Sequence, residues 1–328
     1  MQISRNLRRV IPLVLLVTLF AASGANCNQW VRSYSQPRTL PEAATLDQIV
    51  GRINSNAAKV QSLEANSATV STGALSVRAN IALQTPRRLR LVASGPLASG
   101  PVLDLGSNDE LFWLWTKQNQ QPALFFCRHD QYAMSNARQI MPVEPSWLLE
   151  AIGLVHIDTS QPIEGPWSVG RERVQIRSRQ ASMLGDLSKV TVVNAWDGTV
   201  LEQHLYDPQG QLLATARNAR YQHDPVSGAA LPRATDLQFP TAQISLHLDV
   251  TDWRVNTIAP DNLTLWTKPV YPGYPDVDLA DPNLRFAIPG APPPASGAAP
   301  PGAGVPPAAA GISPSAPVPA AGLPLPRR

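Results

Sequence analysis

The stretch Val102-Leu-Asp-Leu-Gly-Ser-Asn-Asp-Glu-Leu-Phe-Trp-Leu-Trp115 decides the fold class. Two apolar runs, residues 102–105 and 111–115, flank the quartet Gly106-Ser-Asn-Asp109. These four residue types tolerate positive φ or bond their own backbone, so they predict a hairpin turn. The second run is apolar at every position, which indicates a strand covered on both faces rather than one with a solvated face.

The sequence around this hairpin predicts an antiparallel meander. In residues 76–83, Val77, Ala79, Ile81 and Leu83 alternate with smaller or polar side chains, as in a half-buried strand. Short connections between such segments require antiparallel pairing, because parallel crossovers need a dozen or more residues. The expected strands are 67–72, 75–84, 87–94, 102–105, 110–117, 123–128, 172–179, 189–195, 199–206, 211–221, 233–239 and 244–250.

Two helices are expected. Thr45-Leu-Asp-Gln48 has the pattern of a capping box, and apolar residues at helical spacing follow it. That apolar stripe must pack on the sheet. A second, mid-chain helix is predicted over residues 146–154, where Ser146 is a possible N-cap after the strand-breaking Pro142 and Pro145. The fold class is therefore mainly β with two covering helices.

The N-terminus is predicted to be a signal peptide, residues 1–26. Three arginines precede the apolar run 10–22, which is shorter than the roughly 20 residues of a membrane span. Export is expected, with a retained anchor as the alternative. Cys27 follows at the position of a lipid-modified cysteine, although Gly24 and Asn26 are poor lipobox residues. Lipid attachment at Cys27, a disulfide with Cys127 and unpaired cysteines all stay open.

Composition limits the classes of partner. The chain has 27 Lys+Arg and 24 Asp+Glu, and three of the arginines lie in the predicted signal peptide, so the mature chain is formally neutral. A nucleic-acid-binding face needs an excess of basic residues, so nucleic acid is not an expected partner. Residues 27–44 form a predicted tether, and residues 279–328 a Pro/Ala-rich disordered tail. The tail is either a passive spacer or a ligand for a polyproline-binding partner.

Motifs for chemistry are scarce. The five histidines lack the i, i+4 spacing of a helical zinc site, and Cys127 with His129 would hold a metal only with further ligands. The sequence has no Gly-x-Ser-x-Gly motif and no Gly-rich phosphate loop. We therefore expect no metal, no cofactor and no enzymatic activity.

The order of elements resembles a known family. One amphipathic helix, meandering strands, the phrase DLGSNDELFWLW, a mid-chain helix and further strands are similar to the LolA/LolB-like lipoprotein-carrier fold over residues 45–256. This resemblance implies a strongly curved, incompletely closed antiparallel barrel, lidded by helices around an apolar cavity for acyl chains. The corresponding domain is expected to span residues 45–278.

The expected function follows from that resemblance. It implies a non-catalytic, periplasmic lipoprotein, anchored at the outer membrane, which binds acyl chains or lipidated proteins and carries or receives them. A structural or interaction lipoprotein with a side-chain-filled cavity is the alternative, and an enzyme comes third. The residues expected to line the cavity are Leu46, Ile49, Ile53, Phe112, Leu114, Trp147 and Leu148.

Overall fold

A computed structural model describes residues 38–73, 75–95, 100–117, 122–182 and 185–284. The chain divides into two units, Met1–Leu284 and Arg285–Arg328. The second unit lies outside the described residues. So do the predicted signal peptide, the predicted lipid-attachment residue Cys27 and the tether up to residue 37.

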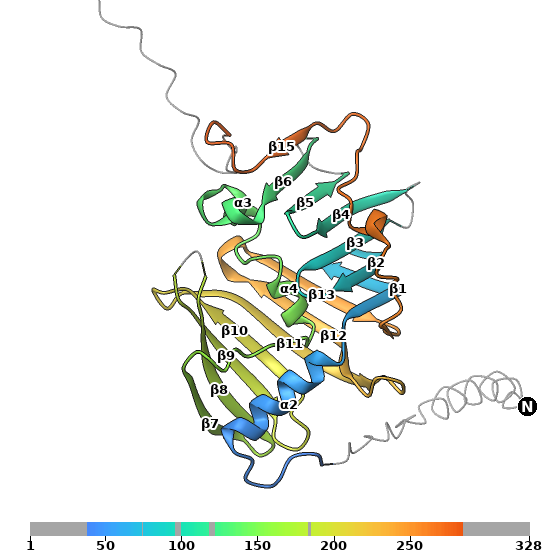
Figure 1. Ribbon diagram of the computed structural model, residues 1–328. Coiled ribbons are helices and arrows are strands. Elements are labelled where there is room, and N and C mark those ends of the chain that lie inside the picture. Colours follow the sequence, from blue (N-terminus) through green and yellow to red (C-terminus); the bar gives the residue numbers. More distant parts are fainter. Residues whose placement is uncertain (1–37, 74, 96–99, 118–121, 183–184, 285–328) are drawn as a thin grey trace, which may run out of the picture. The chain divides into compact units, whose positions relative to one another are not determined.

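Within the described residues, fifteen strands form one sheet (Figure 1). The order is β15-β6-β5-β4-β3-β2-β1-β13-β12-β11-β10-β9-β8-β7, with β14 pairing β1 outside this path. β15 pairs parallel with β6, and the other pairings are antiparallel. The path ends at β15 and β7 without closing, which confirms the predicted unclosed antiparallel sheet. The strands are β1 Ser62–Thr72, β2 Leu75–Gln84, β3 Arg88–Ser94, β4 Pro101–Ser107, β5 Leu111–Thr116, β6 Leu124–Arg128, β7 Ile163–Gly170, β8 Arg173–Gln180, β9 Leu187–Asn194, β10 Val200–Tyr206, β11 Leu212–His223, β12 Ala230–Phe239, β13 Ile244–Val250, β14 Arg254–Val255 and β15 Asp276–Asp278.

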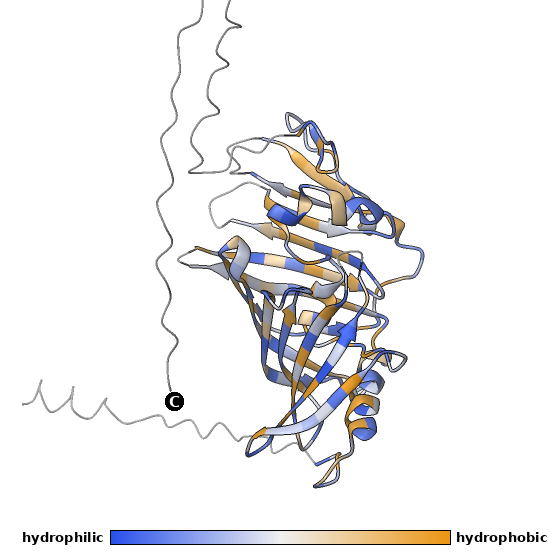
Figure 2. Ribbon diagram, turned by 90° about the vertical axis from the view of Figure 1, so that its left-hand side faces the viewer, coloured by the Kyte–Doolittle hydropathy of each residue, from blue (hydrophilic) through white to orange (hydrophobic). Residues whose placement is uncertain are grey.

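The amphipathic helix α2, Leu46–Ala58, begins at the predicted capping box. The Thr45 hydroxyl accepts a hydrogen bond from the Gln48 amide at 3.3 Å, and the Thr45 amide donates to Gln48 Oε1 at 2.9 Å. The apolar stripe of α2 is buried in a cluster that also holds side chains of β8, β9 and β10. Hydrophobic and hydrophilic residues alternate along several strands in Figure 2, as expected for strands that are covered on one face.

The connection between β6 and β7 crosses the sheet. These two strands lie near opposite ends of the strand order, so the chain between them has to traverse one face, which we call the inner face. The connection carries the 3₁₀-helix η1, His129–Met134, and the short helices α3, Ala137–Ile140, and α4, Trp147–Ala151. The mid-chain helix is thus present but shorter than predicted. Ser146 does not cap it, because its backbone (φ −57°, ψ −31°) is already helical instead of extended.

The hairpin of β4 and β5 departs from prediction in one respect. The turn is made by Asn108, whose Oδ1 accepts hydrogen bonds from the amides of Glu110 and Leu111 at 2.9 Å. Gly106 is not part of it, since it lies within β4 opposite Trp113 of β5. A Cβ at Gly106 would lie 2.0 Å from Trp113 Cζ2. Glycine is therefore required here for the close approach of an indole.

The strand β5 is covered on both faces, as its continuous apolar run predicts. Trp113 and Trp115 point to the outer face, where Trp115 stacks on Tyr271 of the C-terminal segment with ring centroids 3.9 Å apart. Beneath this segment Asp104, which is fully buried, accepts hydrogen bonds from Trp113 Nε1, Arg90 Nη2 and the Tyr271 hydroxyl at 3.1, 2.7 and 2.6 Å. The cover on this side is thus the segment between β14 and β15, residues 256–275.

Buried residues lie outside the predicted domain, residues 45–278, at both of its ends. Leu40, in the predicted tether, is buried beside α2, and the amides of Thr39 and Leu40 donate to the Trp196 carbonyl at 2.8 Å. Leu279, one residue past the predicted boundary at 278, is buried, and its amide donates to the Phe126 carbonyl at 2.8 Å.

Candidate functional site

The inner face of the sheet is apolar at its centre, and α4 lies on it. Leu149 of α4, with Ile152 and Leu154 just after it, belongs to one buried cluster with residues of β1, β2 and β3. Trp147 and Ala151 belong to a second cluster, with residues of β10, β11 and β12. Several sheet residues in these clusters are alanines, which leave room for the helix: Ala65, Ala68, Ala79, Ala93, Ala214 and Ala216. The short helix thus covers apolar surface from both halves of the sheet.

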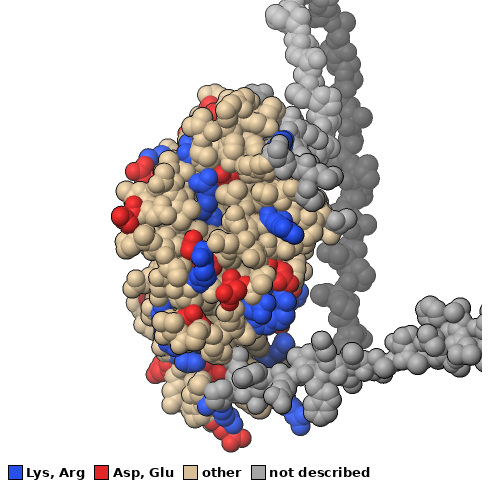
Figure 3. Space-filling view, turned by 90° about the vertical axis from the view of Figure 1, so that its right-hand side faces the viewer, with Lys and Arg blue, Asp and Glu red and all other residues tan. Residues whose placement is uncertain are grey.

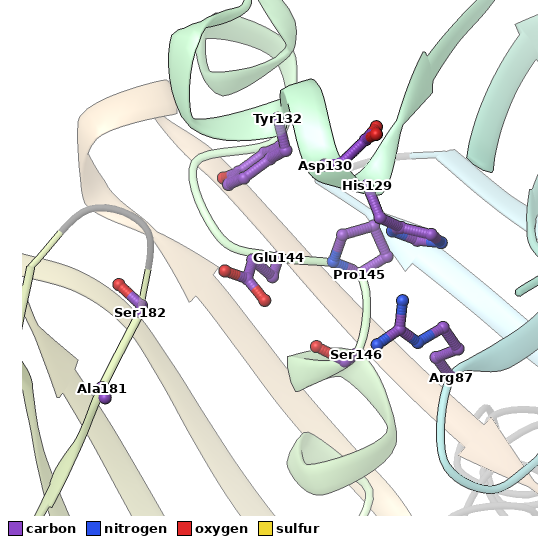
Figure 4. Close-up of a pocket in the computed structure, with 9 residues that line it drawn as sticks. All are labelled: Arg87, His129, Asp130, Tyr132, Glu144, Pro145, Ser146, Ala181 and Ser182. Carbon is purple, nitrogen blue, oxygen red and sulfur yellow. The ribbon is translucent and has the colours of Figure 1, made fainter. Parts of the chain in front are cut away.

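Two clefts adjoin α4. The first has a volume of about 560 Å³, and in Figure 4 the side chains of Arg87, His129, Glu144 and Ser146 line it, together with Asp130, Tyr132, Pro145, Ala181 and Ser182. The second, of about 780 Å³, extends between α2 and α4. It is lined by Asn54, Ser55, Ala57, Ala58, Val60, Gln61, Thr85, Pro86, Ser146, Leu149, Glu150, Leu154 and His156. Both volumes fall in the range of small-molecule sites, roughly 300–1,000 Å³.

A polar group lies within the apolar inner face. Lys189 of β9 is only 3% exposed, and its ammonium is 2.5 Å from Glu150 Oε2 of α4. Gln203 of β10 donates through Nε2 to the Glu150 carbonyl at 2.7 Å. Gln203 Oε1 and Thr191 Oγ1 are buried and have no hydrogen-bond partner among the described residues. Glu150 of α4 therefore accepts both of these hydrogen bonds, the one from β9 and the one from β10.

The first cleft contains groups whose protonation is shifted by burial. His129 Nε2 lies 2.9 Å from the Asn108 carbonyl, and desolvation lowers the pKa of His129 below its usual value of 6.5. Burial also raises the pKa of Glu144 above its usual 4.5. The Tyr132 hydroxyl donates to the Met141 carbonyl at 2.8 Å, and burial raises its pKa. Because His129 Nε2 and the Tyr132 hydroxyl each already bond a backbone carbonyl, both side chains are held in place in the cleft wall.

Cys127 of β6, two residues before His129, is a buried thiol. Cys127 is fully buried, and burial raises the pKa of its thiol, which disfavours the reactive thiolate.

In the part of the chain that the structure describes, no three His, Cys, Asp or Glu residues are grouped so as to hold a metal ion. Nor does any described helix have the length and apolar character needed to cross a membrane. On the face shown in Figure 3, basic and acidic side chains are interspersed.

The depressed pKa of His129 predicts a pH dependence of stability. As the pH falls through 6.5, the unfolded chain takes up a proton that the folded His129 accepts only at lower pH, so the free energy of unfolding should decrease. His129→Gln should make this decrease shallower between about pH 7.5 and 5.5, measured by urea unfolding. Glu144 acts in the opposite direction, because its raised pKa contributes stability that is lost as the pH rises.

The control for this prediction is His223→Gln, which changes an exposed histidine of β11. That variant should keep the wild-type pH profile. An unchanged profile in His129→Gln as well would contradict the assignment.

The structure places the predicted cavity residues in three separate groups. Ile49 and Ile53, at 1% and 2% exposure, share a packed cluster with Leu46, which is partly buried. Trp147 and the partly buried Leu148 lie in the α4 segment. The third group is Phe112 and Leu114 of β5, where the Phe112 ring centroid is 5.9 Å from that of His129 and 6.1 Å from that of Tyr132.

Sequence reasoning missed the polar group around Lys189. The alternation in Leu187-Ser-Lys-Val-Thr-Val-Val193 contains the signal, since Lys189 and Thr191 occupy the same face as the buried Leu187 and Val193. A lysine in register with buried residues marks an interior charge, and interior charges need a partner.

Comparison with known proteins finds solved structures that are similar to part of this chain at low sequence identity. No family model and no curated protein matches the chain. A LolA superfamily protein from Nitrosomonas europaea is 11% identical, covering 67% of this chain and 97% of its own, with a TM-score of 0.43. An outer membrane lipoprotein-sorting protein domain from Vibrio parahaemolyticus is 11% identical, with 66% and 98% covered and a TM-score of 0.45. A DUF1329 family protein from Desulfovibrio piger is 11% identical, with 65% and 92% covered and a TM-score of 0.43.

Proposed function

We propose that this protein is a non-catalytic, exported binding protein that takes up an acyl chain, either of a lipid or of a lipidated protein, on the inner face of its sheet. The observation that carries the proposal is the nature of the cover on that face. A helix of five residues, α4, covers apolar surface contributed by both halves of the sheet, and clefts adjoin it. In this proposal α4 is a lid that an acyl chain replaces.

The exchange is energetically reasonable. Each CH₂ group buried from water contributes about 0.8 kcal/mol, so a long acyl chain offsets the loss of the few apolar side chains that α4 places on the sheet. The connection between β6 and β7 contains no strand, so its displacement would leave the hydrogen bonds of the sheet intact. The cleft between α2 and α4 gives a chain access to the edge of the lid.

A filled, structural version of the same fold is the second candidate. Two observations favour it. Ile49, Val50 and Ile53 of α2 are at most 3% exposed, and Trp147 contacts Phe239 with ring centroids 6.0 Å apart. In this version α4 is a permanent part of the core, and the protein acts through its surface.

Weakening the lid distinguishes these two functions. Leu149→Ala removes a buried side chain of α4 that packs against β1, β2 and β3. If α4 is a lid, the open state becomes more populated, and a fluorescent fatty-acyl probe should bind more tightly than to the wild type. Probe binding is measured by titration. Urea unfolding measures the free energy of unfolding, which should fall by about 2–5 kcal/mol.

The matched control is Ile53→Ala, which removes a similarly buried side chain from α2, 2% exposed against 3% for Leu149. It should reduce stability without tightening probe binding. If neither the wild type nor Leu149→Ala binds the probe, the carrier function is refuted and the filled fold is retained.

Export and membrane anchoring complete the proposal. They are supported by the apolar run 10–22 and by the position of Cys27, which four residues separate from that run. The intact mass of the mature protein provides the test. A chain that begins at Cys27 and carries an added lipid mass is expected, whereas an unmodified chain that begins at Asn26 would contradict anchoring.

A further inference from the structure

An apolar side chain at position 189 would pack on the inner face better than the buried Lys189 does. Its neighbours on the inner face include Leu187, Leu205 and Val193, all of them buried. Burying an ammonium is costly unless it is paired and hydrogen-bonded, and apolar residues often replace buried ion pairs without loss of stability. The position therefore calls for an explanation other than stability.

The groups around Lys189 have unused capacity to bind a ligand. An ammonium has three donors, and among the described residues that of Lys189 donates to Glu150 Oε2, at 2.5 Å. On the same face of the sheet, Thr191 and Gln203 are fully buried, and each has a side-chain oxygen without a partner in the described ranges. Fully buried polar atoms are nearly always satisfied, so this set has the composition of a site rather than of a core.

The Glu150 side chain has space to move away from Lys189. It is 19% exposed, and the residue lines the 780 Å³ cleft between α2 and α4. A change of its side-chain rotamer would take the carboxylate into that cleft and leave the ammonium of Lys189 on the inner face. The carboxylate of Glu150 therefore stands where an incoming anion would bind.

We propose that the acyl ligand of this protein carries an anionic head group, and that Lys189 binds this head group in place of the Glu150 carboxylate. The inference rests on the proposed acyl-binding function. Thr191 and Gln203 supply further hydrogen bonds beside the ammonium, and the acyl chain lies on the apolar surface that α4 covers. Arrival of the anion releases Glu150, and with it the ion pair that ties α4 to β9.

The shared chemistry is an anion on an acyl chain, which a free fatty acid or an anionic phospholipid both provide. The test uses two acids and their neutral counterparts: palmitate with methyl palmitate, and palmitoyl lysophosphatidic acid with monopalmitoylglycerol. Each displaces a fluorescent acyl probe from the full-length protein. The wild type should bind at least one acid about 10- to 100-fold more tightly than its neutral counterpart, as expected for a charge-assisted hydrogen bond. The preferred acid identifies the source.

The variants assign that preference to Lys189. Lys189→Met should abolish the preference for the acid and leave binding of the neutral ligand unchanged. Glu150→Gln should strengthen binding of the acid, because it removes the internal competitor. The double variant Lys189→Met with Glu150→Gln leaves no unpaired charge, so it keeps the test valid if Lys189→Met alone does not fold. Lys117→Met, which changes an exposed lysine just after β5, is the matched control and should behave as the wild type.

The outcomes separate this inference from the function on which it rests. Equal binding of acid and neutral ligand by the wild type, unchanged in Lys189→Met, would overturn the head-group site while acyl binding stands. Failure of every acyl ligand to bind, in the wild type and in Glu150→Gln, would overturn both.

Discussion

Replacing Gly106 with alanine is expected to lower the free energy of unfolding by about 3–5 kcal/mol, the range seen when a large buried aromatic side chain loses its packing. The added Cβ would lie 2.0 Å from Trp113 Cζ2, so the fully buried indole has to leave its position. Its Nε1 then also loses the hydrogen bond to Asp104. Urea unfolding followed by tryptophan fluorescence measures the change.

The control for this prediction is Gly51→Ala. Gly51 lies on an exposed side of α2, and a Cβ added there would have open space around it, with no neighbouring atom within 4 Å. That change should stabilise the protein by about 0.5–1 kcal/mol through helix propensity. Equal and small effects at both glycines would refute the proposed role of Gly106.

Asp104→Leu is expected to be similarly damaging, at about 3–5 kcal/mol, because it breaks a buried ion pair by removing one partner. Trp113 Nε1, Arg90 Nη2 and the Tyr271 hydroxyl all lose their acceptor at once. Since Tyr271 belongs to the C-terminal cover of the outer face, limited proteolysis should cut residues 263–274 faster than in the wild type.

Asp109→Leu provides the comparison, since it breaks an aspartate–arginine pair at the surface. The Asp109 side chain is 57% exposed and pairs with Arg88. Exposed pairs of this kind contribute roughly 0–1 kcal/mol. If Asp104→Leu costs no more than Asp109→Leu, or leaves proteolysis unchanged, the buried carboxylate does not hold the C-terminal segment.

Local sequence patterns predicted the elements in which one signal dominates. The capping box at Thr45 and the apolar stripe after it gave α2, and alternation gave β2 and the strands near it. The continuous apolar run in β5 correctly required a second covering layer. Each of these signals depends on residues close together in the chain, so no knowledge of the tertiary fold was needed.

The elements that were missed depend on distant residues. β7 contains Gly165 and Pro166, and its register shifts between Glu164 and Trp167, so no alternation is visible in its sequence. β15 is three residues long and is defined only by its pairing with β6. At the candidate site, Glu150 and Lys189 meet because the β6–β7 connection crosses the sheet. Neither segment has a sequence periodicity from which this crossing could be predicted.

The pairing of β1 with β13 determines when the molecule can fold. Ala68 pairs with Val250, so the two meanders join only once almost the whole domain is available. Closing so long a loop is entropically costly and slow, which makes this the late step of folding. The chain is synthesised from its N-terminus, so the edge of β1 that pairs with β13 stays unpaired until residues 244–250 have been made. Open edges of this kind pair readily with other chains, so during that interval the unpaired edge of β1 is the part of the sheet most exposed to aggregation.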